Sequence, residues 1–285
     1  MNLPRTPATV SAPATVSAPA TATATDVTPE AALPAETALP PAPLALVRNG
    51  PVLHVRLNPT AQDDVLNTAV LDALIDVLDD LHDQPDIRIL VLSSLGDDFC
   101  LGADRREYQD ALDTDPTGGS LLRIADKAHR LCQALENTHA VTIARLHGKV
   151  VGAGLALAAY CDLRAGADTC RFRMPEVGLG LAPAWGGAMG RLITEAGAAR
   201  IRELMLTCET FDAATAHRLG LLHKVAPLDA LDDTVTAWTR PLSRRSPQAL
   251  LLTRRMLTGY TRAARTADPT LLDSHLLAAQ LTGPR

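Results

Sequence analysis

The chain has 285 residues, of which 47% are apolar and 21% charged, a composition typical of soluble globular proteins. Its net charge of −5 and aromatic content of only 3% argue against a nucleic-acid partner, because they favour neither phosphate attraction nor base stacking. No run of about 18 apolar residues occurs, so no membrane-spanning segment is expected.

Residues 1–43 form a repetitive Ala/Thr/Pro/Val tract with almost no bulky core-forming side chains. Such a tract cannot bury enough apolar surface to offset the entropy lost on ordering, so we predict a disordered tail. A targeting role is the alternative, although the tract is too polar and too rich in proline for a signal peptide. We expect residues 44–225 to form the core and residues 226–285 to form a helical C-terminal region.

Apolar residues after residue 44 follow strand and helix periods in alternation. Strands are predicted at 52–57, 87–92, 141–144, 162–165, 170–172 and 221–225. Helices are predicted at 71–81 with Thr68 as the cap, at 121–135, at 152–160, and over most of the chain after 187. This alternation indicates an α/β fold with right-handed crossovers.

Cysteine and histidine spacing bears on the redox setting and on metal binding. The five cysteines are odd in number, widely spaced and without a CxxC pair, which argues against a disulfide framework and against a zinc knuckle. The eight histidines form no HxxxH or HxxEH arrangement, so no metal site is expected. A reducing, cytoplasmic location is the simplest interpretation.

The first motif, at residues 99–104, reads Phe-Cys-Leu-Gly-Ala-Asp and follows the strand predicted at 87–92. Ligands of α/β proteins bind at loops that follow the carboxyl ends of parallel strands. Gly102 would let backbone N–H groups approach such a ligand closely. The alternative is an ordinary turn in which Asp104 caps the next helix.

The second motif, at residues 147–157, runs from a short strand through a Gly/Ala-rich turn into a helix. The N-terminus of that helix offers unpaired N–H donors and the positive end of the helix dipole, which could hold an oxyanion or a phosphate. The glycine spacing matches neither a P-loop nor GxGxxG. Tight packing of the helix on a sheet is the alternative.

The third motif, at residues 172–187, places Glu176 among apolar residues and rigid Pro/Gly turns. A desolvated carboxyl group has a raised pKa and could shuttle a proton near neutral pH. The alternative is a charged side chain exposed to water.

In this order, the three motifs resemble the enoyl-CoA hydratase/isomerase (crotonase) family, whose members carry FCAGAD, NGxxxGGG and a PE-x-x-x-G-x-x-P-x-x-GG loop. The resemblance extends from residue 57 to residue 225. It includes further similar segments at 57–59, 64–67, 160–164, 206–210 and 216–221. It implies a crotonase-like ββα spiral core with a helical C-terminal extension.

In that family two backbone N–H groups bind the thioester oxygen of an enolate, and the resemblance places them at Ala103 and Ala153. The PE-loop base corresponds to Glu176. The second glutamate of the hydratases corresponds to Ala156, and a further acid of dienoyl-CoA isomerases and of a dehalogenase corresponds to Ala184, so both carboxylates are absent. Because only the PE-loop glutamate is kept, the chain resembles the Δ3,Δ2-enoyl-CoA isomerases, and we expect double-bond isomerisation.

The resemblance also implies which residues contact the substrate. His147 is either a second acid/base group or a strand-end histidine that binds backbone, and Trp185 either walls the acyl pocket or only packs. Arg105 lies either near the CoA phosphates or on a solvated helix face. The expected contact residues are Val65, Leu66, Leu101, Gly102, Asp104, Arg105, His147, Gly152 and Trp185.

Other activities are compatible with the same residues. Within the family these are a hydratase with a weak second acid, a decarboxylase and a thioester hydrolase; a non-catalytic binding subunit with this fold is the other alternative. No permanent cofactor is expected, since coenzyme A enters as part of the thioester, and an acyl-carrier thioester could replace it. The family resemblance implies a homotrimer or a dimer of trimers, built through the C-terminal helices.

Overall fold

The computed structural model describes residues 42–59, 63–263 and 272–282. The tail predicted over residues 1–43 lies outside the described residues except for its last two. The first described strand is β1 (Leu44–Asn49), which starts at the residue where the sequence predicts the core to begin.

The described residues contain a six-stranded sheet in the order β1-β2-β3-β4-β6-β9. Its remaining strands are β2 (Val52–Leu57), β3 (Ile89–Ser94), β4 (Val141–Leu146), β6 (Leu163–Ala167) and β9 (Lys224–Ala226). β1 runs antiparallel to β2, and all the other neighbouring strands are parallel. The residues of β3 are all buried, as expected for a parallel strand covered on both faces.

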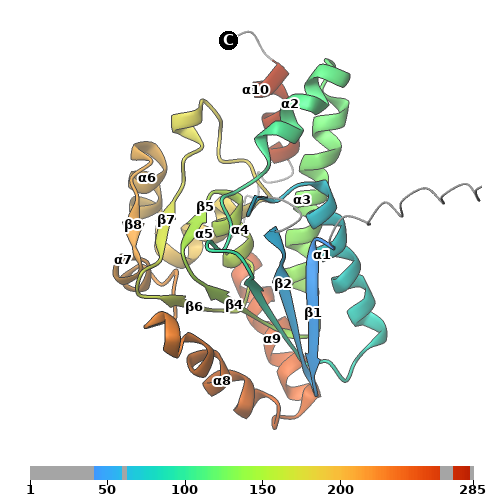
Figure 1. The fold of residues 1–285 in the computed structure, drawn as a ribbon, viewed down its shortest axis with the longest axis vertical. Coiled ribbons are helices and arrows are strands. Elements are labelled where there is room, and N and C mark those ends of the chain that lie inside the picture. Colours follow the sequence, from blue (N-terminus) through green and yellow to red (C-terminus); the bar gives the residue numbers. More distant parts are fainter. Residues whose placement is uncertain (1–41, 60–62, 264–271, 283–285) are drawn as a thin grey trace, which may run out of the picture. The chain divides into compact units, whose positions relative to one another are not determined.

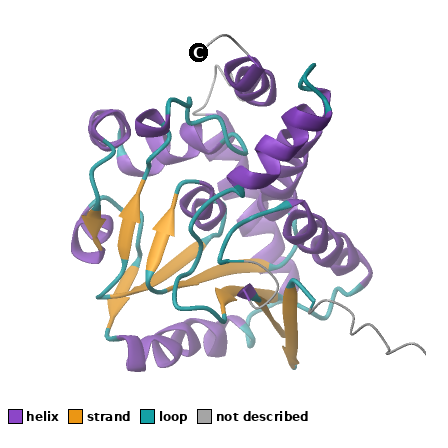
Figure 2. Cartoon of the chain, turned by 45° about the horizontal axis from the view of Figure 1, so that its top comes forward, coloured by secondary structure: helices purple, strands orange, loops and turns teal. Residues whose placement is uncertain are grey.

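Helices cover both faces of this sheet (Figures 1 and 2). On one face, α1 (Thr68–Asp80) and α3 (Gly119–Asn137) pack on β2 and β3, where Leu78 and Leu131 meet Val55. α8 (Leu231–Leu242) contacts β4, β6 and β9, and lies on the face that carries His54 and Val91. Successive strand residues point to opposite faces, so α8 lies opposite α1 and α3.

A three-stranded sheet stands beside the large one, in the order β5-β7-β8. It consists of β5 (Lys149–Val151), β7 (Arg171–Arg173) and β8 (Phe211–Asp212). The rings of Phe172 and Phe211 stack with their centroids 5.4 Å apart. Helix α4 (Ala153–Ala159) starts directly after β5, and all of its residues are buried.

The remaining elements are helices and 3₁₀ turns. Those after residue 226 form the helical C-terminal extension that the sequence predicts. The remaining helices are α2 (Arg105–Thr114), α5 (Ala188–Ala196), α6 (Ala198–Thr207), α7 (Ala213–Arg218), α9 (Pro247–Ala263) and α10 (Asp273–Thr282), with 3₁₀ turns η2 (Leu81–Asp83), η3 (Val177–Leu179) and η4 (Leu228–Ala230). α10 packs on α3 although the two are far apart in the chain. No helix in the described ranges is both long and apolar enough to cross a membrane.

The predicted cap of α1 was wrong by one residue. Asn67 is the N-cap, and its side chain accepts a hydrogen bond of 3.0 Å from the amide of Val70. The amide of Thr68 instead donates to the carboxylate of Glu107 on α2, over 2.9 Å to Oε2. Glu107 therefore accepts from a backbone N–H of α1 that has no partner within the helix. A local sequence pattern cannot identify this acceptor, because it lies on another helix.

Strand boundaries also differ from those predicted. The strand expected at 87–92 is found at Ile89–Ser94, because Val52 pairs with Ile89 and this register carries the ladder to Ser94. β5 and β8 were not predicted, because strands of only three and two residues are too short to show a periodic pattern. α2 escaped prediction because its face is polar and only Tyr108 is buried.

Candidate active site

The first motif forms a loop held between two other segments by backbone hydrogen bonds. The amide of Val151 donates to the carbonyl of Cys100 over 2.9 Å, which ties the loop to β5. On its other side, the amide of Leu66 donates to Gly102 over 2.8 Å, and the amide of Asp104 donates to Leu66 over 3.0 Å. Leu66 is thus hydrogen-bonded to Gly102 and Asp104, the two neighbours of Ala103. In a parallel pairing the residue between them turns its own N–H to the other side, so the N–H of Ala103 points away from Leu66.

Gly102 brings this loop close to the start of α4. Its φ of +111° is a conformation that favours glycine. A Cβ atom placed on Gly102 would lie 3.4 Å from the carbonyl oxygen of Val151 and 3.9 Å from the amide nitrogen of Ala153. The first and second motifs, which are far apart in the sequence, therefore meet at Ala103 and Ala153.

The second motif presents the N-terminus of α4 at this meeting point. Gly152 is the N-cap, with φ +49° and no side-chain capping bond, and Ala153 is the first helical residue. The N–H of a first helical residue has no acceptor within its own helix and lies at the positive end of the helix dipole. The N–H groups of Ala103 and Ala153 are thus two backbone donors at the junction of the two loops.

Glu176 approaches the same junction from the third motif. A Cβ atom on Gly152 would lie 2.9 Å from Oε1 of Glu176, so the carboxylate lies against the N-cap of α4. The amide of Gly152 also donates to the carbonyl of Arg173 over 2.9 Å, which fixes the strand that leads to Glu176. Burial raises the pKa of the half-buried Glu176 carboxyl above its ordinary value. The side chain is therefore a partly desolvated carboxylate and not a freely solvated surface charge.

These groups line one mostly apolar cavity of about 90 Å³. The lining residues named from the sequence are Leu101, Gly102, Ala103, Arg105, Gly152, Ala153, Glu176 and Trp185. Val65, Leu66 and Asp104 do not line it: Leu66 supports the first loop from behind, and Asp104 caps α2 by accepting from the amide of Arg106 over 2.9 Å.

His147 does not reach the cavity. Its Nε2 lies 2.7 Å from the carbonyl oxygen of Gly96, and its Nδ1 lies 3.2 Å from a guanidinium nitrogen of Arg145. With Nδ1 accepting from Arg145, Nε2 donates to Gly96, so both ring nitrogens are used. The ring lines a different hollow, on the α8 side of the sheet. The structure therefore places His147 in the backbone-bound role and away from Glu176.

The two positions of the missing carboxylates are occupied by methyl groups. Ala156 is buried in α4, and Ala184 lines the cavity with only 5% of its surface exposed. Ala184 packs with Tyr108 and Leu277 in one apolar cluster. In the described residues, Glu176 is the only carboxylate among those that line the cavity.

Two lining residues of the cavity lie outside the three motifs and were missed by sequence reasoning, Tyr108 and Leu277. Tyr108 is buried in α2 with its hydroxyl beside the indole of Trp185, and burial raises its pKa. It could have been suspected, because it is the one aromatic side chain in a polar segment directly after the first motif. Leu277 gave no such signal, since α10 comes to the site only through the packing of the chain.

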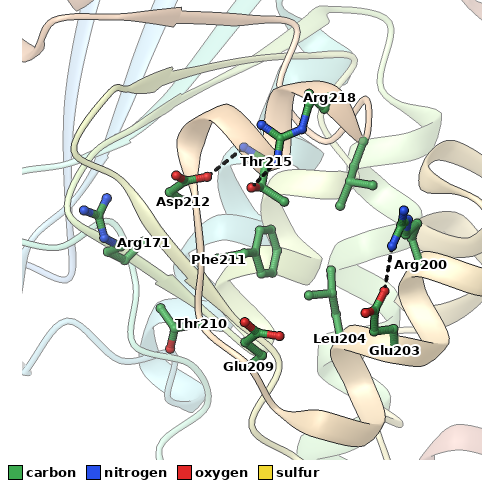
Figure 3. Close-up of a pocket in the computed structure, with 11 residues that line it drawn as sticks. Arg171, Arg200, Glu203, Leu204, Glu209, Thr210, Phe211, Asp212, Thr215 and Arg218 are labelled. Atoms are coloured by element: carbon green, nitrogen blue, oxygen red, sulfur yellow. Dashed lines mark hydrogen bonds and ion pairs between the residues drawn. The ribbon is translucent and has the colours of Figure 1, made fainter.

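A larger hollow, of about 690 Å³, lies beside the small sheet and contains none of these groups (Figure 3). Its charges are mixed: Arg200 pairs with Glu203 over 2.9 Å, and Arg218 donates to the hydroxyl of Thr215 over 2.8 Å. This hollow is larger than the first cavity, but Ala103, Ala153 and Glu176 do not line it. We therefore assign the candidate active site to the smaller cavity.

The described residues contain no group of three or more His, Cys, Asp or Glu side chains placed to hold a metal ion.

Comparison with known proteins decides the family. The profile of the enoyl-CoA hydratase/isomerase family matches residues 48–277. The chain belongs to the enoyl-CoA hydratase/isomerase (crotonase) family. The resemblance found in the three motifs is thereby confirmed, and the crotonase-like fold with its helical C-terminal extension is confirmed with it.

Named relatives include both hydratases and isomerases. The chain is 32% identical over 195 residues to a probable enoyl-CoA hydratase, echA8, of Mycobacterium bovis, a match that covers 68% of this chain and 73% of the relative. It is 30% identical over 217 residues to the peroxisomal Delta(3,5)-Delta(2,4)-dienoyl-CoA isomerase of Arabidopsis thaliana, covering 72% and 77%. The crystal structure of an enoyl-CoA hydratase from Mycobacterium avium superposes with a TM-score of 0.73 at 26% identity, covering 85% of this chain and 92% of that one.

Proposed function

We propose that this family member stabilises a thioester enolate with the N–H groups of Ala103 and Ala153 and moves a proton with Glu176, to shift the double bond of an enoyl-CoA. One observation carries the proposal: two backbone donors and a single carboxylate share one cavity, with Ala156 and Ala184 where partner carboxylates would stand.

The two donors suit a negative charge that develops on the thioester oxygen. Both belong to backbone fixed by neighbouring hydrogen bonds and by the start of α4, so little reorganisation is needed as the charge grows. The N-terminal end of the α4 dipole adds a favourable field. Each donor of this kind typically stabilises a transition state by about 3–4 kcal/mol.

Glu176 can supply the proton transfers of an isomerisation alone. Its carboxylate takes a proton from C2 of a 3-enoyl thioester, and the released electron pair delocalises through the C3–C4 double bond and onto the thioester oxygen. Return of the same proton to C4 leaves a C2–C3 double bond, so atoms and charge balance without a second acid. The raised pKa of Glu176 lets the carboxyl hold the proton between the two steps.

Hydration of a 2-enoyl-CoA is the second candidate, and the printed names of the hydratase relatives favour it. Water addition is most easily done with one carboxylate that positions water and another that supplies the α-proton. The methyl groups of Ala156 and Ala184 supply neither function, which is why we place isomerisation first. Decarboxylation, thioester hydrolysis and a purely binding role are separated from it by the same assay.

The assay incubates the protein with a 3-enoyl-CoA, with crotonyl-CoA and with a malonyl-type thioester, and identifies products by mass spectrometry. We expect conversion of the 3-enoyl-CoA to its 2-enoyl isomer. Glu176→Gln should abolish this turnover while the protein still binds coenzyme A thioesters. Glu203→Gln, which changes an exposed glutamate of the large hollow, is the matched control and should retain activity. Faster hydration than isomerisation, or full activity of Glu176→Gln, would refute the proposal.

We also propose that the substrate is an acyl-CoA or acyl-carrier thioester and that Arg105, at the cavity, favours its phosphate-bearing arm. A homotrimer or dimer of trimers is the assembly we propose. It is supported by exposed apolar side chains on α9, of which Met256 is 62% and Tyr260 is 73% exposed in the single chain.

A further inference from the structure

Three residues that line the cavity come from separate parts of the chain, and we call them its wall. Tyr108 comes from α2, Trp185 from the loop after Glu176, and Leu277 from α10. The two backbone donors and Glu176 line the same cavity, so an acyl chain held by its thioester oxygen would extend toward this wall.

The wall is supported from behind by a second layer of packed side chains. Tyr108, Ala184 and Leu277 form one apolar cluster with Leu121 and Ala125 of α3, and Leu121 is fully buried. Close-packed side chains yield little space without strain, so this part of the cavity cannot deepen freely.

Trp185 is held in place on both sides. Its indole lies beside the hydroxyl of Tyr108, and both residues line the cavity. The next residue, Gly186, has φ +62°, and a Cβ atom there would lie 2.5 Å from the sulfur of Cys132 on α3. The backbone beside Trp185 is thus pressed against α3, and the indole has little freedom to swing away.

Helix α10 is fixed to the same loop by a direct bond. The amide of Ala182 donates to Oε1 of Gln280 over 2.6 Å, which joins the loop that carries Trp185 to the helix that carries Leu277. Thr282, at the end of α10, lies close to Gly118, the residue before α3: a Cβ atom on Gly118 would lie 2.8 Å from its side chain. α10 therefore also packs closely on the segment before α3. The wall is therefore a connected unit.

The volume of the whole cavity limits what it can hold. An apolar protein cavity of about 150 Å³ accommodates the six carbons of benzene. At about 90 Å³, this cavity has room for about four carbons. We propose that Trp185 and Tyr108 restrict the substrate to short acyl chains of about four carbons, an inference that rests on the proposed thioester function.

Binding of saturated acyl-CoAs tests the limit without requiring turnover. Dissociation constants of butyryl-, hexanoyl-, octanoyl- and decanoyl-CoA are measured by isothermal titration calorimetry. We expect the wild-type protein to bind butyryl-CoA at least about tenfold more tightly than decanoyl-CoA, since a pocket that is too small rejects added methylenes. Trp185→Ala and Tyr108→Ala should reverse this order by opening the wall.

Two controls keep the effect specific. Tyr108→Phe removes the hydroxyl but keeps the ring, so it should keep the preference for butyryl-CoA. Trp238→Ala makes the same change at the other tryptophan, which packs against His223 and Lys224 outside the cavity, and should also keep it. A wild-type affinity that rises with chain length, equal affinities, or no binding of any acyl-CoA would overturn the limit. The proposed isomerisation fails separately, if acyl-CoAs bind in this order but the 3-enoyl-CoA is not converted.

Discussion

The amide of Gly178 donates a hydrogen bond to the thiol sulfur of Cys208 over 3.2 Å. The carbonyl of the same cysteine accepts a bond of 2.9 Å from Nε of Arg173. Cys208 therefore holds the chain on both sides of Glu176, and it does so from a left-handed conformation with φ +53°, which is rare for a residue other than glycine.

From this relationship we expect Cys208 to be a positioning residue for Glu176. Cys208→Ala leaves the amide of Gly178 without its acceptor, and the resulting shift of the carboxylate should lower kcat by about tenfold to a hundredfold with little change in KM. Cys208→Ser retains an acceptor and should recover most of the rate. Steady-state kinetics with the 3-enoyl-CoA measures both effects, and a wild-type kcat in Cys208→Ala would contradict the role.

Cys208→Gly separates stability from activity at the same position. Glycine adopts φ +53° without steric cost, so the free energy of unfolding of Cys208→Gly should exceed that of Cys208→Ala by about 1 kcal/mol. The sulfur acceptor is lost in both variants, so both should have a similarly low kcat. Denaturant unfolding and kinetics on the same preparations test this, and the idea fails if Cys208→Gly is no more stable than Cys208→Ala.

The stability of the protein should depend on pH through Glu176. Burial raises the pKa of this carboxyl, so the folded chain keeps a proton at pH values where the unfolded chain has released it. Stability from this group is complete below the ordinary glutamate pKa of about 4.3 and is lost as the pH rises through the raised folded pKa. Glu176→Gln removes this loss.

We therefore expect Glu176→Gln to unfold at higher denaturant concentration than the wild type at pH 8. The difference should shrink as the pH falls toward about 4. Denaturant titrations monitored by circular dichroism across this range measure it. A variant that is less stable than the wild type at pH 8 would show that the carboxylate makes favourable contacts that outweigh its desolvation.

The oxyanion role of Ala153 can be tested by removing its backbone N–H, which is the proposed hydrogen-bond donor. Proline has no N–H and is well tolerated at the first position of a helix, where Ala153 stands. Ala153→Pro should lower kcat by about a hundredfold to a thousandfold while the protein remains folded. Ala153→Gly keeps the N–H and serves as the control. Comparable kcat values for the two variants would remove Ala153 from the mechanism.

Arg254 anchors α9 to the core. Its guanidinium is buried and donates to Asp162 over 2.7 Å, to the carbonyl of Glu136 over 3.0 Å and to that of Leu135 over 2.6 Å. Arg254→Ala removes these buried hydrogen bonds and the charge that faces Asp162, and it should lower the free energy of unfolding by about 3 kcal/mol. The neighbouring Arg255 is exposed, and Arg255→Ala should change it by less than about 0.5 kcal/mol. Thermal and denaturant unfolding of the pair checks the contrast.

The exposed apolar face of α9 should be covered by a second copy of the chain in the proposed trimer. Met256→Glu combined with Tyr260→Glu places charges on that face, where burial would be costly. We expect this variant to shift the mass seen by light scattering from a trimer, or a multiple of it, toward the monomer. An unchanged mass, or a monomeric wild type, would contradict an interface at α9.

The sequence alone determined much of this protein, because some signals are local. A continuous apolar run predicts a buried parallel strand, and 89–92 lies in one. Glycines at 102 and 152 adopt positive φ where the motifs turn, and the motifs reveal the single glutamate of the third loop and the alanines at 156 and 184. These features depend on residue type and spacing, so they can be read before folding.

Only the tertiary structure decided how the cavity is closed and which groups face it. Leu277 and Tyr108 are brought together by α10 packing on α3, a long-range contact that no local period encodes. His147 was named as a possible second acid, but it lies in the turn between β4 and β5 and its ring contacts Gly96 and Arg145. Which side chain faces a site depends on the register of distant strands and the docking of distant helices, and these are set by the packing of the whole core.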